Sequence, residues 1–125
     1  MVVFPDMLLT TVEECVRLLD RLAHPSVKLV FDTAHMTMMN GDVLSAWRQL
    51  RHHVGPIQLA DMPARTEPGS GAIDFVALLS EIVKDGRRGE LLELEFGWSD
   101  ASVAGEKAGM RALRCIDRQI SGNLG

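Results

Sequence analysis

The chain has 125 residues, of which 46% are hydrophobic and 24% charged, as in an ordinary soluble globular domain. A formal net charge of -4, with its basic residues scattered, argues against a nucleic-acid surface, which needs clustered Lys and Arg. No apolar run approaches the ~20 residues of a membrane span, and the first six residues lack the basic and long apolar regions of a signal peptide. We therefore expect a cytoplasmic protein with neither nucleic-acid nor membrane partners.

The two cysteines, Cys15 and Cys115, lie far apart in the sequence and belong to no CxxC motif. They therefore predict neither a zinc finger nor a disulfide framework.

The first predicted element is a helix over residues 11–23. Thr11 and Glu14 have the spacing of a capping box. Apolar residues follow at helical spacing: Val12, Cys15, Val16, Leu19 and Leu22. The short apolar run 28–32, which follows Pro25, then predicts a buried strand that ends at Asp32.

Two further helices and two further strands alternate after this point. Asp42 opens a predicted helix that Gly55 and Pro56 close, and residues 56–61 form the next strand. Asp74 caps a predicted helix over 75–84, and residues 91–96 form the third strand. The apolar stripe of the first of these helices contains Val43, Trp47, Leu50 and Val54.

A last helix is expected to begin at Ser99 or Asp100 and to run to about Gln119. Its interior glycines weaken this prediction. The positions expected to be buried are Val103, Met110, Leu113 and Ile116.

This order of elements predicts an α/β fold in which about three parallel strands alternate with four helices. A closed (β/α)₈ barrel takes about 250 residues, so the chain is about half of one. Residues 1–125 then form a single domain, which is either a small open sheet or the carboxyl-terminal half of a barrel.

Polar residues gather where the predicted strands end, which is where parallel α/β proteins place their ligands. They are Asp32 and His35 after the first strand, Gln58 and Asp61 on the second, and Glu93 and Glu95 on the third. Period-2 alternation turns Glu93 and Glu95 inward and leaves Leu92, Leu94 and Phe96 to pack on helices. Carboxylates with a neutral oxygen donor between them suit Mg²⁺ or Mn²⁺. Glu95 is the strongest candidate, because an inward carboxylate needs a cation or a proton-transfer role.

Several of these residues have structural alternatives. Asp32 at a strand end is also suited to capping the following turn, and His35 to an ordinary surface position. Arg65 and Glu67 could form a loop salt bridge. The turn Gly69-Ser-Gly71 could cradle a phosphate, although a plain turn is the commoner structure.

Three segments together resemble the carboxyl-terminal half of the hydroxypyruvate isomerases, a family of xylose isomerase-like barrels. They are Phe31-Asp-Thr-Ala-His35, the strand and loop over 57–71, and Leu94-Glu-Phe96. The resemblance runs from about Pro5 to Trp98, and the loop from Gln58 to Gly71 is its most specific part.

The resemblance implies metal-assisted aldose–ketose isomerisation of hydroxypyruvate to tartronate semialdehyde through an enediolate. It implies Asp32, Gln58 and Glu95 as ligands of a divalent metal and Glu95 as a catalytic acid/base. It also implies that His35, Arg65 and Glu67 bind the small hydroxy-carbonyl or sugar substrate. The fourth metal ligand of the family, a glutamate from an earlier strand, has no counterpart in the chain, so the metal need not be retained.

Three alternatives remain open at this point. The chain could pair with itself as a homo-oligomer, or with a complementary amino-terminal half barrel. It could be a catalytically incompetent half-barrel fragment, or it could act as another sugar isomerase or epimerase of the same family.

Overall fold

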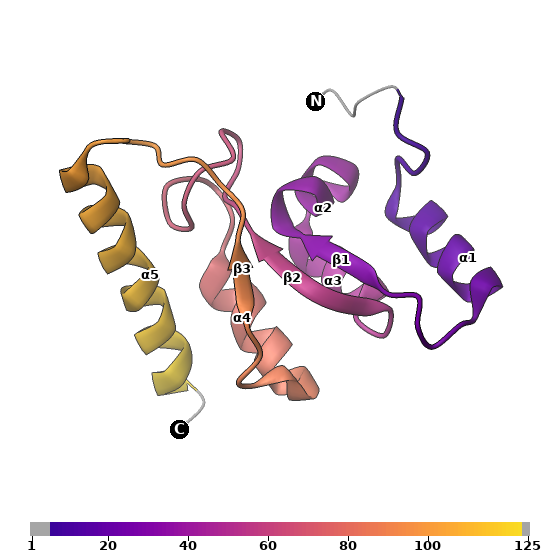
Figure 1. Ribbon diagram of the computed structural model, residues 1–125. Coiled ribbons are helices and arrows are strands. Elements are labelled where there is room, and N and C mark those ends of the chain that lie inside the picture. The colour runs from indigo at the N-terminus through magenta and orange to yellow at the C-terminus, as the bar shows by residue number, and fades with distance from the viewer. Residues whose placement is uncertain (1–5, 124–125) are drawn as a thin grey trace.

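The computed structural model describes residues 6–123, which fold around a three-stranded parallel sheet (Figure 1). The elements in chain order are α1 (Val12–Leu22), β1 (Leu29–Asp32), α2 (Thr33–Asn40), α3 (Val43–Leu50), β2 (Val54–Leu59), α4 (Phe75–Ile82), the π-helical turn η1 (Val83–Arg87), β3 (Leu92–Leu94) and α5 (Val103–Asn123). None of these helices is long and apolar enough to cross a membrane.

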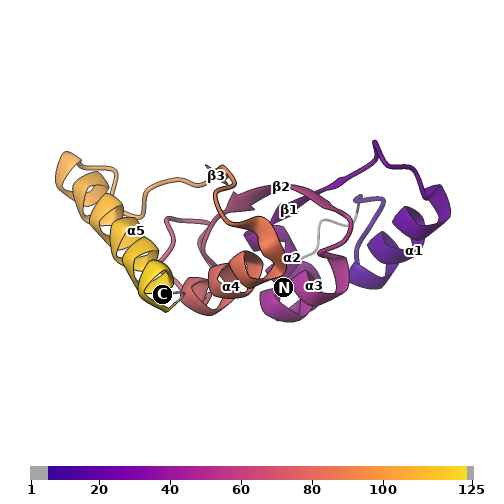
Figure 2. The same ribbon diagram turned by 90° about the horizontal axis from the view of Figure 1, so that it is seen from below.

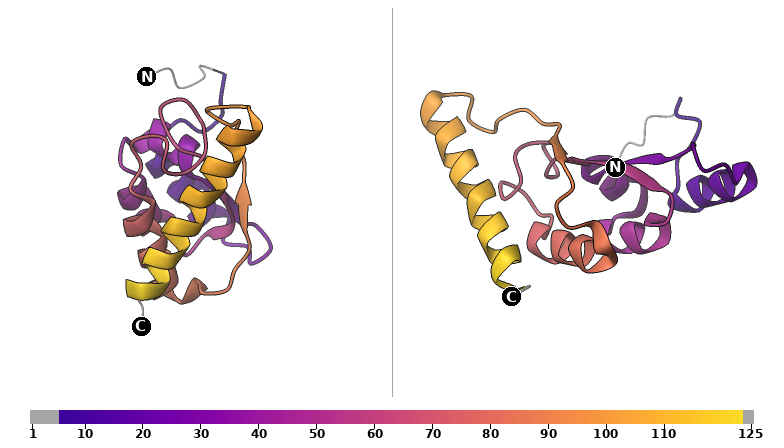
Figure 3. Two further views of the ribbon diagram at one scale, coloured as in Figure 1. Left: turned by 90° about the vertical axis from the view of Figure 1, so that its left-hand side faces the viewer. Right: turned by 60° about the horizontal axis from the view of Figure 1, so that its bottom comes forward.

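The sheet has the strand order β1-β2-β3, and both neighbouring pairs are parallel. Helices α3 and α4 lie below the strands in Figure 2, whereas α1 and α5 flank the two ends of the molecule (Figure 3). This arrangement is an arc of a (β/α) barrel. The predicted α/β fold, with three parallel strands of a partial barrel, is confirmed, and it contains one α-helix more than the four predicted.

Helix α1 begins as its sequence predicts. The Thr11 hydroxyl accepts a hydrogen bond from the Glu14 N–H over 3.2 Å, and Glu14 Oε2 accepts one from the Thr11 N–H over 3.1 Å. Hydrogen bonds from Thr10 and Thr11 hold the pKa of Glu14 below its usual value. The helix buries one stripe, formed by Val12, Cys15 and Leu19.

Helix α2 was not predicted. The segment Thr33–Asn40 has a weak apolar stripe, and the prediction treated it as a loop between Asp32 and Asp42. The helix forms because Asp32 caps its amino terminus and because it packs on β1, β2 and α3. Its carboxyl end is Gly41, in a left-handed conformation with φ of 74°.

The predicted end of the next helix is wrong. Helix α3 is capped by Asp42 as expected but ends at Leu50, and the segment Val54–Pro56 belongs to β2. The pairing of β2 with β1 determines where the helix stops and the strand begins. Leu29 lies opposite Val54, and the Leu29 N–H donates to the His53 carbonyl over 2.8 Å. This non-local pairing outweighs the local helical pattern.

Helix α4 begins after its predicted cap, Asp74, whose side chain accepts from the Ala77 N–H over 2.9 Å. It ends at Ile82 and continues into η1, where Gly86 adopts a φ of 93° that favours glycine. Strand β3 is confined to Leu92–Leu94, which is shorter than predicted.

Helix α5 begins at Val103, later than predicted, and its cap is Ser102, whose hydroxyl accepts from the Gly105 N–H over 3.0 Å. Val103 and Met110, both expected to be buried, are exposed. The close contacts are instead made by two glycines, because a Cβ at Gly105 would meet Asp100 and one at Gly109 would meet the Trp98 ring. Leu113 and Ile116 are half-buried.

The core lies between the sheet and helices α1 to α4. Phe31 and Trp47 meet edge to face at its centre, with ring centroids 5.3 Å apart. The Trp47 indole donates to Asp85 over 2.8 Å, so its polar atom is satisfied inside the core.

Candidate functional site

An open cavity of about 670 Å³ lies at the carboxyl ends of the strands. Five of the six predicted site residues line it: Asp32, His35, Gln58, Arg65 and Glu95. The rest of the wall is mostly apolar and comes from the segment before α1 and from α1, β1 and α2: Met7, Leu8, Leu9, Cys15, Leu29, Val30, Met36 and Met39. We call this feature the strand-end cavity. It combines an apolar wall with a few convergent polar groups, as ligand sites commonly do.

Asp32 caps the following helix, as its position in the sequence allowed, and it also pairs with Arg65. Its Oδ1 atom accepts from the backbone N–H groups of Ala34 and His35, over 2.9 Å and 3.0 Å, and so caps α2. Its Oδ2 atom accepts from Arg65 Nη2 over 3.1 Å. The buried carboxylate is therefore hydrogen-bonded on both oxygens and neutralised by a guanidinium, which is what burial of a charge requires.

Arg65 joins Asp32 to His35. Its Nη1 atom lies 3.1 Å from His35 Nε2. A guanidinium can only donate, so His35 Nε2 is the acceptor in this contact. Arg65 has a φ of 56°, an uncommon backbone conformation for a residue other than glycine. The left-handed turn belongs to the loop that directs this side chain back over the strand ends.

A buried carboxylate, named above only as one of the polar residues at the strand ends, holds this loop. Asp61 is fully buried. Its Oδ1 accepts from the N–H groups of Met62 and Ile73, and its Oδ2 from those of Gly69 and Gly71, over 2.8–3.0 Å. Because Asp61 binds both glycine amides, the phosphate cradle considered for this turn is wrong. The signal in the sequence was a carboxylate that follows a buried strand directly and precedes a loop rich in small residues.

Glu67 lies apart from the other predicted site residues. It is buried and does not line the strand-end cavity. Its Oε2 atom accepts from the Ser99 N–H over 2.8 Å, and its Oε1 atom accepts from the Ser99 hydroxyl. Burial raises the pKa of Glu67, but these hydrogen bonds outweigh it and leave the pKa below its usual value of 4.5. The alternative of an Arg65–Glu67 loop salt bridge is wrong, because Arg65 pairs with Asp32.

Three polar residues form one row across the sheet. Gln58 on β2 is the register partner of Asp32 on β1 and of Glu93 on β3. The Gln58 amide donates to Glu93 Oε2 over 2.8 Å. Glu95 lies just beyond β3, where its N–H donates to the Leu59 carbonyl over 3.1 Å, and its exposed side chain reaches the strand-end cavity.

The predicted ligands have the right chemistry for a divalent metal, but there are too few of them. Asp32, Gln58 and Glu95 supply hard oxygen ligands, which Mg²⁺ and Mn²⁺ prefer. However, Arg65 already balances the charge of Asp32. Within residues 6–123 there is also no group of three His, Cys, Asp or Glu side chains placed to hold a metal ion. The described residues therefore do not make a metal site by themselves.

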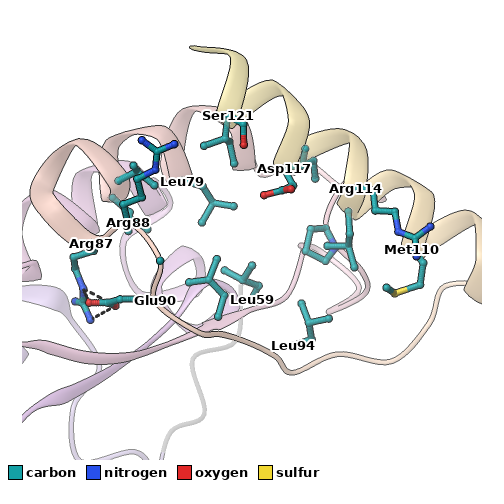
Figure 4. Close-up of a pocket in the computed structure, with 18 residues that line it drawn as sticks. Leu59, Leu79, Arg87, Arg88, Glu90, Leu94, Met110, Arg114, Asp117 and Ser121 are labelled. Carbon is teal, nitrogen blue, oxygen red and sulfur yellow. Dashed lines mark hydrogen bonds and ion pairs between the residues drawn. The ribbon is translucent and has the colours of Figure 1, made fainter. Parts of the chain in front are cut away.

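A second hollow, of about 620 Å³, lies between β3, α4 and α5 (Figure 4). Leu59, Leu79 and Leu94 point into it, whereas the charged residues Arg88 and Arg114 stand at its rim. We call this hollow the α5 groove. It adjoins β3, which is one of the two edge strands of the described sheet, and Leu94 is half-exposed there.

The chain belongs to the xylose isomerase-like TIM barrel family, whose profile matches residues 4–118. It is 32% identical to hydroxypyruvate isomerase of Escherichia coli over 78 residues, which are 62% of this chain and 30% of that protein. It is 31% identical to a putative hydroxypyruvate isomerase of Mus musculus over 86 residues, which are 68% of this chain and 31% of that protein. These similarities confirm the resemblance predicted from the sequence. The chain spans about a third of the length of these relatives.

Solved structures agree on the fold. The apo structure of the 3-keto-D-glucoside 4-epimerase of E. coli superposes with a TM-score of 0.75 at 24% identity, over 90% of this chain and 41% of the other. The similarity therefore covers nearly all of this chain but less than half of the other.

Proposed function

We propose that this chain contributes the carboxyl-terminal half of a barrel site that isomerises a small hydroxy-carbonyl compound, with conversion of hydroxypyruvate to tartronate semialdehyde as the reaction. One observation carries the proposal. Side chains from the ends of all three strands, together with Arg65 from the following loop, line a single cavity. The similarity to hydroxypyruvate isomerases supports the choice of substrate.

In this proposal Arg65 and His35 bind the oxygens of the substrate. Asp32 holds the guanidinium of Arg65 from behind, and Arg65 in turn contacts His35. The pair is thus oriented before a substrate arrives, which lowers the entropic cost of binding.

Glu95 is the proposed acid/base. Its carboxylate removes a proton from the carbon that carries the hydroxyl group and so forms an enediolate. It then returns the proton to the former carbonyl carbon, while the hydroxyl proton passes from one substrate oxygen to the other. A positioned carboxylate of this kind contributes about 10²- to 10⁴-fold to a rate. The exposure of Glu95 at the rim of the cavity leaves it accessible to a substrate.

A divalent metal belongs to this proposal only when additional donors complete the site. Asp32, Gln58 and Glu95 are then its ligands from this chain. Because the described residues alone do not make a metal site, the proton transfer above is assigned to side chains of the chain and no step depends on the ion.

The proposed partner is an amino-terminal half barrel. A (β/α)₈ barrel has eight strands and the described sheet has three, so five are required to close it. Two copies of the described sheet supply six, which does not close an eight-stranded barrel. The α5 groove and the free edge of β3 are suited to receive the first of the five, because an added parallel strand would cover the half-exposed Leu94.

The experiment is co-expression with the part of E. coli hydroxypyruvate isomerase that precedes the region similar to this chain. We expect a complex with one copy of each chain by light scattering, and conversion of hydroxypyruvate by that complex. Replacement of Glu95→Gln should lower kcat about 100-fold or more, whereas Glu106→Gln, on the exposed face of α5, should not. Turnover by the Glu95→Gln complex at the unsubstituted rate would remove Glu95 from the mechanism.

A second candidate function is a catalytically incompetent half barrel. It is favoured by the pairing of Asp32 with Arg65, which leaves the candidate metal ligands short of one free carboxylate. A stable complex that binds neither Mn²⁺ nor hydroxypyruvate would support it, and turnover by the complex would exclude it. If the complex instead acts on a ketose, the protein is another sugar isomerase or epimerase of the family.

A further inference from the structure

The orientation of one amide in the strand-end cavity is determined by its neighbour on β3. Gln58 and Glu93 are register partners, and the Gln58 amide lies 2.8 Å from Glu93 Oε2. Gln58 lines the strand-end cavity, whereas Glu93 does not. Glu93 thus contacts a residue of the proposed site from outside it.

The chemistry of the two groups allows only one arrangement. An ionised carboxylate can accept hydrogen bonds but cannot donate them. The Gln58 group that faces Glu93 must therefore be the NH₂ group, although the two ends of an amide have nearly the same shape. The amide oxygen, Oε1, is consequently the atom left for the cavity.

We propose that Glu93 is a positioning residue that fixes the Gln58 amide with its oxygen toward the strand-end cavity. This inference rests on the proposed function for its role in turnover, and on the geometry of the row alone for the orientation of the amide. The cavity then presents a fixed neutral acceptor beside the cationic Arg65 and the acidic Glu95. Such an acceptor binds a hydroxyl group of the substrate.

This role gives a reason for the negative charge of Glu93, whose partner in the row of Asp32, Gln58 and Glu93 is the Gln58 amide. A second carboxylate two residues before Glu95 would add repulsion to an acidic strand end. Through its hydrogen bond to a neutral amide, Glu93 instead orients that amide and lies outside the cavity wall.

Two substitutions at position 93 test whether this residue sets the orientation of the Gln58 amide. Glu93→Gln offers both an acceptor oxygen and an NH₂ donor, so it allows the Gln58 amide either orientation. Glu93→Lys offers only donors, so it favours a reversed amide with the NH₂ group toward the cavity. Glu106→Lys makes the same change of charge on the exposed face of α5 and serves as the control.

The first measurement is the ¹H–¹⁵N spectrum of the Gln58 side-chain amide in the chain alone, assigned by its loss in Gln58→Leu. We expect one NH₂ proton to be shifted downfield by the carboxylate. The shift should be unchanged in Glu106→Lys and smaller in Glu93→Gln. The shift should disappear in Glu93→Lys. The same amide spectrum in Glu93→Lys as in the unsubstituted chain would overturn the inference, whether or not the protein is an isomerase.

The second measurement is turnover by the co-expressed complex. Loss of one oriented hydrogen bond of about 1.4 kcal/mol corresponds to about a tenfold fall in kcat/KM for Glu93→Lys, and Glu93→Gln should recover only part of it. If Glu93→Lys turns over as fast as Glu106→Lys, the positioning role is wrong. A complex without turnover would contradict the proposed function, and the amide spectrum would still decide the orientation.

Discussion

Thr33 and Ala60 are joined by two hydrogen bonds through one hydroxyl group. Thr33 Oγ1 donates to the Ala60 carbonyl over 2.7 Å and accepts from the Ala60 N–H over 2.9 Å. Both residues are fully buried. The contact ties the first turn of α2 to the end of β2, so the segment that carries His35 is fixed to the segment that leads to Arg65.

Replacement of Thr33→Val should therefore destabilise the fold. The substitution keeps the size of the side chain but leaves a buried N–H and a buried carbonyl without a partner, at a cost of about 2–4 kcal/mol. Thr33→Ser keeps the hydroxyl and should lose only about 1 kcal/mol for the missing methyl group. Urea unfolding of both variants tests this, and equal losses for Val and Ser would show that packing, not hydrogen bonding, holds the contact.

A larger effect is expected at Asp61, whose carboxylate binds four backbone N–H groups. Asp61→Asn turns one acceptor oxygen into a donor that faces two N–H groups, and we expect a loss of about 3 kcal/mol or more in the free energy of unfolding. Asp74→Asn makes the same chemical change at the exposed cap of α4, where Asn caps as well as Asp does. A variant Asp61→Asn as stable as Asp74→Asn would contradict the anchoring role.

The Glu67–Ser99 contact predicts a dependence of stability on pH. The pKa of Glu67 is lower in the folded chain than its ordinary value of 4.5, so the folded state favours the ionised form. Its stabilisation is fully present above about pH 4.5 and is lost as the pH falls through the lower pKa of the folded state.

We therefore expect Glu67→Gln to be less stable than the unsubstituted chain by about 2 kcal/mol near neutral pH. The difference should shrink as the pH is lowered below 4.5. Unfolding by urea at a series of pH values measures it. A difference that does not change with pH would show that the charge of Glu67 does not contribute.

Two glycines of α5 should respond in opposite directions to alanine. A Cβ at Gly109 would collide with the Trp98 ring, whereas one at Gly122 meets nothing within 4 Å. Gly109→Ala should cost about 1–3 kcal/mol through overpacking, and Gly122→Ala should be neutral or gain up to about 1 kcal/mol in helix propensity. Thermal unfolding followed by circular dichroism distinguishes the two variants. A stabilised Gly109→Ala variant would mean that α5 does not pack against the Trp98 ring at Gly109.

What could be predicted from the sequence depended on local signals. The caps Thr11, Asp42 and Asp74 correctly began three helices, because capping involves residues within one turn of each other. The end of α3 could not be predicted, because the pairing of Leu29 with Val54 sets it from a distance in the sequence.

The candidate site shows the same division. Five of its six residues line one cavity because the ends of parallel strands converge, which the order of elements already implied. Glu67 lies elsewhere because its partner, Ser99, is 32 residues away in the sequence. The position of Asp61 between a buried strand and a loop of small residues was visible in the sequence, but its four N–H partners follow from the folded path of that loop.

The short β3 strand also makes its edge of the sheet a poor template for aggregation. An open sheet edge is a template for pairing with other copies, and proteins protect such edges with short strands and charged side chains. β3 has three residues, and Glu93 and Glu95 lie on it and directly after it. If two copies met at this edge, their carboxylates would repel each other. Glu93 and Glu95 would thus also act as gatekeepers against self-assembly at this edge.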